Sequence, residues 1–475
     1  MISTFKFKKQ WTERTTRTTR RVILGVVVAV VGICAYFGFF RPGLNDFEIV
    51  DQLGGNLFPS AILSVATTDA EIIKPMDSTY VGNPKSLFAV KIRSGRPNSL
   101  VRIELQETPF YARSVSTFVL PEGKTEYVVY PDVLWRYDAL RSNTQAEPVS
   151  VVANVEMNGK DYGQRMRTFS MRSINECLLG YNQQKADGST NFVSTRLFFA
   201  AYVNEENPLI DQVLREALST RIVRRFLGYQ SKAKDAVDKQ VYALWNVLQK
   251  RGFKYSSVSY SSLSSNVVYA QRVRTFEDAL NTSQINCVDG SVLFASLLRA
   301  INITPVLIQI PRHMFVGYYT DASKKHLEVL ETTMIGDVDL DDYFPEERLD
   351  STMQGRSQGE MSRLTFEKSK EYAAKEYAKY EKQIHSNKPS FMFVEISKGV
   401  RRSVQSIGKY LFGCGAFLVP EKLIGYINYE AVGIEFCDAH GGAACSRGFV
   451  VRKEGLPQEL LDELHDQKQT QEMTL

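Results

Sequence analysis

Residues that bind metals are scarce in this chain. It has six cysteines and five histidines among 475 residues, and no two cysteines form a C-x-x-C pair. Cys437, His440 and Cys445 have ligand spacing but no clear fourth ligand. The acidic run 337–342 does not have the spacing of an EF-hand loop, and we interpret it as a solvated turn. We therefore expect no metal and no cofactor.

Basic residues interleaved with aromatics are also lacking beyond the start of the chain. The formal net charge is +5, and the first 21 residues alone carry +6, so the rest is nearly neutral. The short cluster 221–225 is typical of a solvated helix face. This pattern argues against nucleic acid as a partner.

One long uncharged run lies near the start. Residues 22–40 are 19 mostly apolar positions, about 28 Å of helix at ~1.5 Å per residue, enough for one membrane span. The basic residues 1–21 predict a cytoplasmic tail, which places the remainder outside the cytosol. A cleaved signal peptide is the competing interpretation, but no small-x-small site follows the run, and its bulky end at 36–40 favours an anchor.

Residues 58–175 alternate apolar and polar positions in several short runs, with a hairpin signal at Asn158-Gly159. They predict an antiparallel β-sandwich. Because residues 60–172 contain no cysteine and no histidine, we interpret this domain as a spacer or binding module.

Helical patterns follow the predicted sandwich. Asn207-Pro208 predicts a helix start, and a second apolar stripe covers 237–248. We expect a catalytic domain over 200–345 and a helical extension of its core over 346–408, with a polar loop at 351–362 and a charged helix at 363–384. The serine-rich segment 256–266 is placed either to overhang the site or to act as an ordinary linker. Residues 409–475 have no assigned role.

Three residues with the chemistry of a cysteine nucleophile stand in the order thiol, imidazole, acid: Cys287, His313 and Glu331. Ser291, Phe294 and Leu298 follow Cys287 at helical spacing, so the thiol is predicted in the first turn of a helix, on its inward face. The positive end of a helix favours negative charge on sulfur.

Strands are predicted at 306–310, 314–319 and 327–330. His313 begins the second of them, and Glu331 ends the third, where it can hold one ring nitrogen while the other faces sulfur. The backbone N–H of Cys287 is the leading candidate for an oxyanion donor, with Gln284 and Tyr255 as weaker ones.

The motifs Asn-Cys-Val-Asp-Gly-Ser at 286–291, Pro-Arg-His-Met-Phe-Val-Gly at 311–317 and Leu-Glu-Thr-Thr-Met-Ile-Gly at 330–336 resemble the transglutaminase-like superfamily, in particular a poorly characterised group of Gram-negative envelope proteins. The resemblance covers residues 237–333. It implies a papain-like core, with Cys287 as nucleophile, His313 as general base and Glu331 as orienting acid.

The expected protein is therefore α+β: one N-terminal transmembrane helix in the inner membrane, a periplasmic β-sandwich, then a transglutaminase-like domain. It is expected to be a cysteine-dependent acyl transferase or an amide hydrolase or peptidase acting on envelope proteins or peptides. The alternative is an inactive scaffold that binds another envelope component. The sequence leaves the substrate, the acyl acceptor and the oligomeric state open.

Cysteine parity fits an oxidising compartment. With Cys34 in the span, five cysteines lie outside it, so at least one thiol stays free. We favour a disulfide between Cys437 and Cys445 over metal binding there, and leave Cys177 and Cys414 unassigned.

Overall fold

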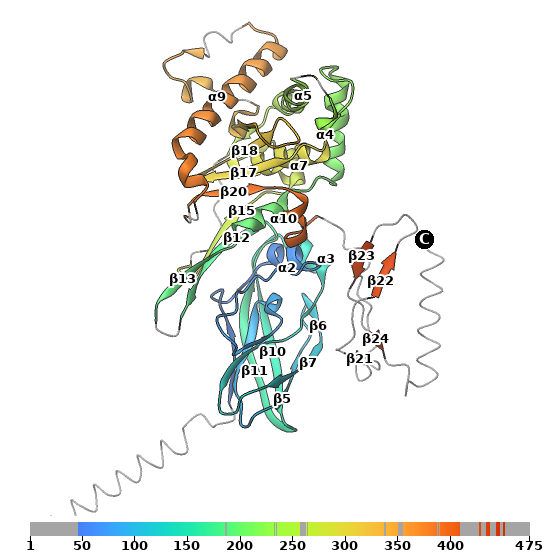
Figure 1. Ribbon diagram of the computed structural model, residues 1–475, viewed down its shortest axis with the longest axis vertical. Helices are drawn as coiled ribbons and strands as arrows, with labels where there is room; N and C mark the ends of the chain where they lie inside the picture. The colour runs from blue at the N-terminus through green and yellow to red at the C-terminus, as the bar shows by residue number, and fades with distance from the viewer. Residues whose placement is uncertain are drawn as a thin grey trace, which may run out of the picture.

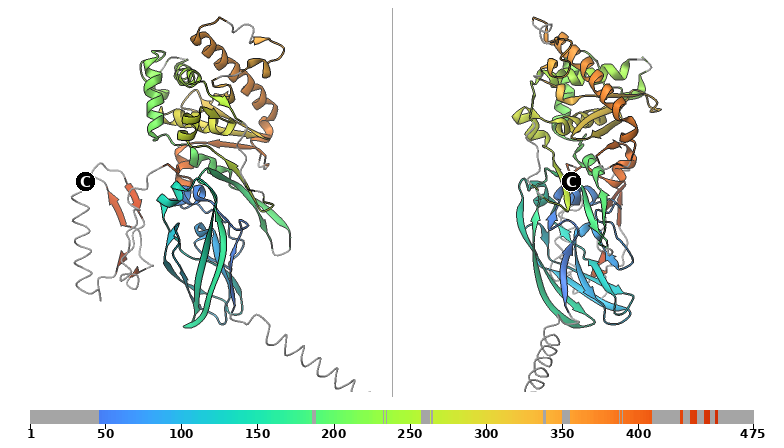
Figure 2. Two further views of the ribbon diagram at one scale, coloured as in Figure 1. Left: turned by 180° about the vertical axis from the view of Figure 1, so that it is seen from behind. Right: turned by 90° about the vertical axis from the view of Figure 1, so that its left-hand side faces the viewer.

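A computed structural model describes residues 46–408, with short gaps at 186–187, 232, 234, 257–262, 264, 337–338, 350–354, 387 and 389, and four short strands between 427 and 451. The predicted tail, the predicted span and most of the C-terminal segment lie outside the described residues. Within the described residues, none of the helices combines the length and the apolar character that crossing a bilayer requires. Mixed helices and sheets give an α+β architecture, arranged as two units end to end (Figures 1 and 2).

Two sheets form the N-terminal unit. The first has the spatial order β1 (Phe47–Asp51), β4 (Phe88–Arg93), β8 (Glu126–Tyr130), β3 (Tyr80–Gly82). The second has the order β2 (Asn56–Leu57), β11 (Lys160–Met171), β10 (Glu147–Met157), β5 (Ser99–Leu105), β7 (Ser114–Leu120). Most neighbours are antiparallel; β3 with β8 and β2 with β11 are parallel. The strands begin at Phe47, earlier than the predicted boundary at residue 58.

Alternating side chains join these two sheets. Val101, Ile103 and Leu105 of β5 are buried between exposed or half-buried neighbours, as the period-two pattern predicts. The rings of Phe88 and Phe169, one from each sheet, lie 5.7 Å apart between centroids. The predicted hairpin at Asn158-Gly159 is confirmed: both residues have positive φ, 51° and 79°, between β10 and β11.

Short elements complete this unit: η1 (Pro84–Ser86), β6 (Tyr111–Ala112), β9 (Leu134–Trp135), α2 (Pro59–Val65) and α3 (Tyr137–Ser142). A three-stranded sheet then leads into the second unit, in the order β13 (Thr190–Ser194), β12 (Glu176–Gln184), β15 (Val268–Arg272). Since β15 comes from the second unit's sequence, this sheet joins the two units.

The second unit is built on the antiparallel sheet β19 (Leu327–Leu330), β18 (His313–Tyr319), β17 (Pro305–Ile310), β20 (Met392–Glu395). Met314, Val316 and Tyr318 of β18 join the core that includes α7 (Cys287–Ala300). Phe315 and Tyr319 alternate with them and pack with Ala373 and Ile384 of α9 (Gln358–Ile384). The two helices therefore cover opposite faces of the sheet, because side chains alternate along a strand.

The remaining described elements of this unit are η2 (Arg196–Tyr202), α4 (Pro208–Ser219), η3 (Gly228–Gln230), α5 (Ala236–Lys250), β14 (Lys254–Tyr255), α6 (Phe276–Thr282), β16 (Gln284–Ile285), η4 (Thr332–Met334), η5 (Leu340–Asp342) and α10 (Lys398–Ser403). The expected starts of α4 and α5 and the three strands around His313 are confirmed within one or two residues. The predicted polar loop at 351–362 is wrong in its last part. There α9 begins at Gln358, because Ser357 and Glu360 form a capping box.

Four strands lie further along the chain: β21 (Ile427–Asn428) pairs with β24 (Val450–Val451), and β22 (Ile434–Cys437) with β23 (Ala443–Ser446). Cys437 is opposite Ala443, and Cys445 opposite Glu435. Their side chains are outside the described part of the structure, so the disulfide stays a prediction.

The segment 396–407, which we call the junction segment, ties the two units together. Its backbone N–H groups at Gln405 and Ile407 donate to the carbonyls of Ser64 and Ala201, both at 2.8 Å. Arg401 donates to the carbonyls of Ala200 (2.8 Å) and Val203 (2.6 Å). Its guanidinium also lies 2.6 Å from the carboxylate of Glu205, which Arg299 also contacts.

Replacing Arg401 with methionine is expected to lower the free energy of unfolding by about 2 kcal/mol, because two buried carbonyls and a carboxylate lose a charged donor. The midpoint of urea denaturation measures this. Arg402→Met is the matched control, since Arg402 is exposed, and it should stay within about 0.5 kcal/mol of wild type. Equal effects of the two substitutions would contradict the role given to Arg401.

Candidate functional site

Cys287 is the first residue of α7, and the preceding asparagine fixes this helix start. The Oδ1 of Asn286 accepts hydrogen bonds from the N–H groups of Val288 (2.7 Å) and Asp289 (2.9 Å), and the Asp289 carboxylate accepts from the N–H of Asn286 (3.1 Å). This is a capping box. Within the described part of the chain, no hydrogen bond engages the N–H of Cys287 itself. Among the residues that the structure describes, this amide donor beside the sulfur has no acceptor.

The side chains that follow Cys287 on the inward face of α7 are buried. Ser291, Phe294 and Leu298 are fully buried, as their spacing predicts, while Cys287 is half-buried. Asp289 is held by Arg274, whose Nη1 lies 2.6 Å from Oδ2 and whose backbone N–H donates to Oδ1 at 2.8 Å. Burial nevertheless raises the pKa of Asp289, even though Arg274 opposes the shift.

His313 is placed by a tight turn between β17 and β18. Ile310 pairs with His313 across the ladder, so Pro311 and Arg312 make a two-residue connection. Proline suits the first of these positions, and Arg312 adopts φ 63° at the second. The side chain of His313 is 26% exposed, and the nearby Cys287 sulfur contributes to the raised pKa of its ring.

Glu331 ends β19 and caps η4. Its side chain is fully buried, and its Oε2 lies 2.5 Å from Nε2 of His313. Its Oε1 accepts from the N–H (2.9 Å) and the hydroxyl (2.7 Å) of Thr333. Because Glu331 occupies Nε2, the other ring nitrogen, Nδ1, is left for the sulfur.

The charge state of His313 follows from its two partners. Burial disfavours the imidazolium, but the Glu331 carboxylate and the Cys287 sulfur outweigh it and raise the pKa of His313 to about 10. At neutral pH the ring therefore carries its proton, which is the state in which it can pair with a thiolate.

The structure thus brings Cys287, His313 and Glu331 together from one helix, one strand and the residue that follows a second strand, and His313 is hydrogen-bonded to Glu331. Three further contributors were not identified from the sequence: Arg274, Asp289 and Thr333. Asp289 has a sequence signal, its capping-box spacing from Asn286. Thr333 lies two residues after Glu331, whereas Arg274 acts through a contact that the chain order does not reveal.

The weaker oxyanion candidates lie just upstream of the thiol. Gln284 and Tyr255 belong to the parallel pair β16 and β14, in which Tyr255 is opposite Ile285. Gln284 is exposed, and Tyr255 is 54% exposed. Most of the serine-rich segment lies outside the described residues.

No metal site competes with this arrangement in the part of the chain that the structure describes: no group of three or more His, Cys, Asp or Glu there could hold an ion. In the acidic run, Asp339 caps η5 by accepting from the N–H of Asp341 at 3.0 Å, and Asp342 is exposed. This matches the predicted solvated turn.

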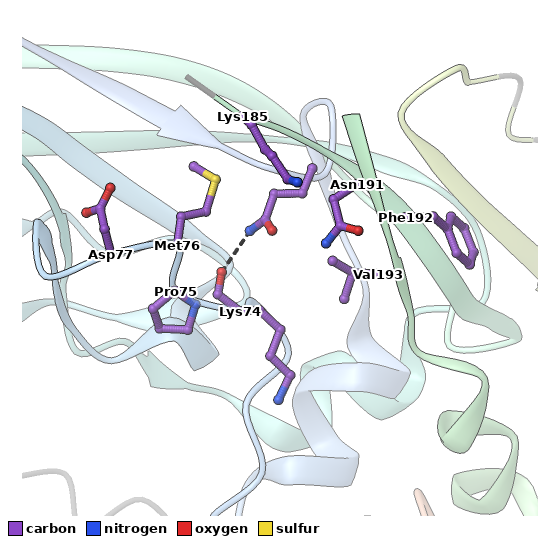
Figure 3. Close-up of a pocket in the computed structure, with 9 residues that line it drawn as sticks. Lys74, Pro75, Met76, Asp77, Lys185, Asn191, Phe192 and Val193 are labelled. Carbon is purple, nitrogen blue, oxygen red and sulfur yellow. Dashed lines mark hydrogen bonds between the residues drawn. The ribbon is translucent and has the colours of Figure 1, made fainter. Parts of the chain in front are cut away.

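A hollow of about 640 Å³ lies elsewhere, between the hairpin of β12 and β13 and residues 74–77 (Figure 3). Lys74 lies on one side of it and Lys185 and Asn191 on the other, and Gln183 donates to the carbonyl of Lys74 at 2.8 Å. Its lining has neither a cysteine nor a histidine. It offers a surface for contact rather than a nucleophile.

Comparison with protein-family models found no match, and comparison with curated proteins found none either.

Gly290 lies three residues after Cys287 and faces Thr332, the residue next to Glu331. A Cβ there would lie 2.7 Å from Oγ1 and 2.9 Å from Cβ of Thr332. Gly290→Ala is therefore expected to destabilise the protein by about 1–3 kcal/mol, because α7 must move away from Glu331. Urea denaturation measures the loss.

Gly359 is the matched control for Gly290, because it is an exposed helical glycine in α9 with nothing within 4 Å of the added carbon. Gly359→Ala should stabilise the protein by about 0.5–1 kcal/mol. If Gly290→Ala and Gly359→Ala both destabilise or both stabilise the protein, the packing argument is contradicted.

Proposed function

We propose that this protein is a cysteine-dependent acyl transferase or amide hydrolase of the transglutaminase-like superfamily, anchored in the inner membrane by residues 22–40 and acting in the periplasm on envelope proteins or peptides. The observation that carries the proposal is the hydrogen bond between buried Glu331 and His313, whose ring lies near the Cys287 sulfur at a helix N-terminus. A nucleophile, a base and an orienting acid in this order are what acyl transfer requires.

In the proposed first half-reaction, the Cys287 thiolate attacks the carbonyl carbon of an amide and a C–S bond forms. The carbonyl electrons move to oxygen, and the unused N–H of Cys287 is positioned to donate to that oxyanion. The imidazolium of His313 then gives its proton to the amide nitrogen. The C–N bond breaks, an amine or ammonia leaves, and a thioester remains.

In the second half-reaction, the neutral His313 takes a proton from water or from a second amine, which attacks the thioester. The C–S bond breaks and the thiolate and imidazolium are restored. Water gives hydrolysis and an amine gives transfer. Glu331 keeps its position in both halves and stabilises the charged ring.

The test is the rate at which iodoacetamide alkylates Cys287 at pH 6 in the purified chain, followed by peptide mass spectrometry. We expect fast labelling, and a rate about 100-fold lower in His313→Ala, because a free thiol with a pKa near ~8.5 is less than about 1% ionised at that pH. Cys177 is the internal control: it is fully buried and burial raises its pKa, so it should react only after unfolding.

The second candidate function is a scaffold without catalysis that binds another envelope component. The observation in its favour is that the hollow in Figure 3 is lined by residues of the strand-rich part of the chain rather than by Cys287 and His313. Slow labelling of Cys287 at pH 6, unchanged in His313→Ala, would overturn the enzyme proposal and favour this one.

A further inference from the structure

The two carboxylate oxygens of Glu331 have different hydrogen-bond partners. While Oε2 of Glu331 contacts His313, Oε1 accepts from both the N–H and the hydroxyl of Thr333. The Thr333 oxygen in turn lies 2.9 Å from the hydroxyl of Tyr343. A continuous line of hydrogen bonds thus runs from Tyr343 to His313 through two buried groups.

The direction of each hydrogen bond in this line follows from its chemistry. An ionised carboxylate only accepts, so the single hydroxyl proton of Thr333 points to Glu331. The Thr333 oxygen must then accept from Tyr343. Burial raises the pKa of Tyr343 to about 12, with Thr333 opposing and Glu331 adding to the shift, so the phenol keeps the proton that it donates.

Helix α9 anchors both ends of this arrangement. The backbone N–H of Glu331 donates to the carbonyl of Ser369 at 3.3 Å. The ring of Tyr343 packs edge-on against Tyr372 of the same helix, 5.2 Å between centroids. Tyr343 therefore has a fixed place from which to hold Thr333.

We propose that Thr333 and Tyr343 are positioning residues for the reactive pair, which fix the orientation of the Glu331 carboxylate and keep its Oε2 against His313. Neither touches the thiol. This inference rests on the proposed function and adds to it two residues that act through Glu331.

Loss of the Thr333 hydroxyl frees the Glu331 carboxylate to turn, which lengthens its contact with the His313 ring. This weakens the hold on the imidazolium, and with it the thiolate.

Three single variants of the full chain test the inference by the pH profile of Cys287 alkylation. Thr333→Val keeps the shape and removes the hydroxyl; we expect labelling at pH 6 to be about tenfold slower and the midpoint of the profile to move to higher pH, as loss of a charge-assisted hydrogen bond implies. Thr333→Ser keeps the hydroxyl and should label within about twofold of wild type. Tyr343→Phe should slow labelling about threefold.

A wild-type profile in Thr333→Val would overturn the inference, and so would equal slowing in Thr333→Val and Thr333→Ser, because the hydroxyl would then not be what matters. Both results leave the proposed function intact as long as wild type labels fast and His313→Ala labels slowly. If wild type itself labels slowly, the proposed function fails, and the positioning role fails with it.

Discussion

Glu331→Gln is expected to lower the pKa of His313 from about 10 to about 7 or below, because it removes the carboxylate charge while the burial that disfavours the imidazolium remains. A fall of three pKa units corresponds to about 4 kcal/mol of interaction. The measurement is an NMR titration of protein carrying ¹³C at Cε1 of histidine. The chain has five histidines, and the resonance that disappears in His313→Gln identifies this one.

This prediction extends to stability. An unfolded histidine titrates near about 6.5, and the folded pKa of His313 lies above that value. The contribution of this residue is therefore complete below about pH 6.5 and is lost as the pH rises through about 10. The difference in unfolding free energy between wild type and Glu331→Gln should accordingly narrow between pH 6.5 and 10.5.

Glu346→Gln is the control, because Glu346 is exposed, and it should follow wild type at every pH. If the His313 resonance of the wild-type protein titrates at about 6.5, the raised pKa of His313 is contradicted. If the difference in unfolding free energy between wild type and Glu331→Gln does not change with pH, the predicted contribution of His313 to stability is contradicted.

The second large effect concerns the turn that carries the thiol. Arg274→Met leaves the Asp289 carboxylate, which is 1% exposed, without the ion-pair partner that it has among the described residues. Removing one member of a buried pair typically costs about 3–5 kcal/mol. Because Asp289 also accepts from the N–H of Asn286, we expect Cys287 alkylation to slow as well.

The stability loss expected in Arg274→Met depends on pH with a defined sign. Burial raises the folded pKa of Asp289 above the unfolded value, so protonation of this residue favours the folded state. The loss in Arg274→Met should be largest at neutral pH and smaller at pH 4.5, where the carboxyl takes up a proton and needs no cation. Urea denaturation at the two pH values measures the difference.

Two further variants complete this test. Arg272→Met changes an exposed arginine two residues away and should stay within about 0.5 kcal/mol of wild type. Arg274→Met combined with Asp289→Asn should regain stability, since the buried charge is gone. A combined variant no more stable than the single one would contradict the assignment of the loss to that charge.

Local patterns were sufficient for much of the second unit and for one hairpin of the N-terminal unit. The start of α7 at Cys287, the strands at 305–310, 313–319 and 327–330 and the hairpin at Asn158-Gly159 all follow from spacing, capping and turn residues. These signals act over a few residues, so they can be read without knowing what packs against them. The start of α9 at Gln358 lies inside the predicted polar loop, although Ser357 and Glu360 carry the local signal of a capping box.

The order of thiol, imidazole and acid along the chain was likewise enough to select Cys287, His313 and Glu331 as candidates. It was not enough to find Thr333 and Tyr343, whose place in the line of hydrogen bonds depends on α9. Nor did it find Arg274, which lies two residues after β15 and contacts Asp289 of α7.

The sequence by itself therefore determined the residue types of the candidate site and the elements that carry them, since both depend on short-range chemistry and periodicity. Only the tertiary structure decided which oxygen of Glu331 faces His313, which amide at the start of α7 stays unused, and which charges are buried. Those features depend on contacts between different elements, such as His313 with Glu331 at 2.5 Å and Arg274 with Asp289 at 2.6 Å, and on the exclusion of water around them, neither of which leaves a local pattern in the chain.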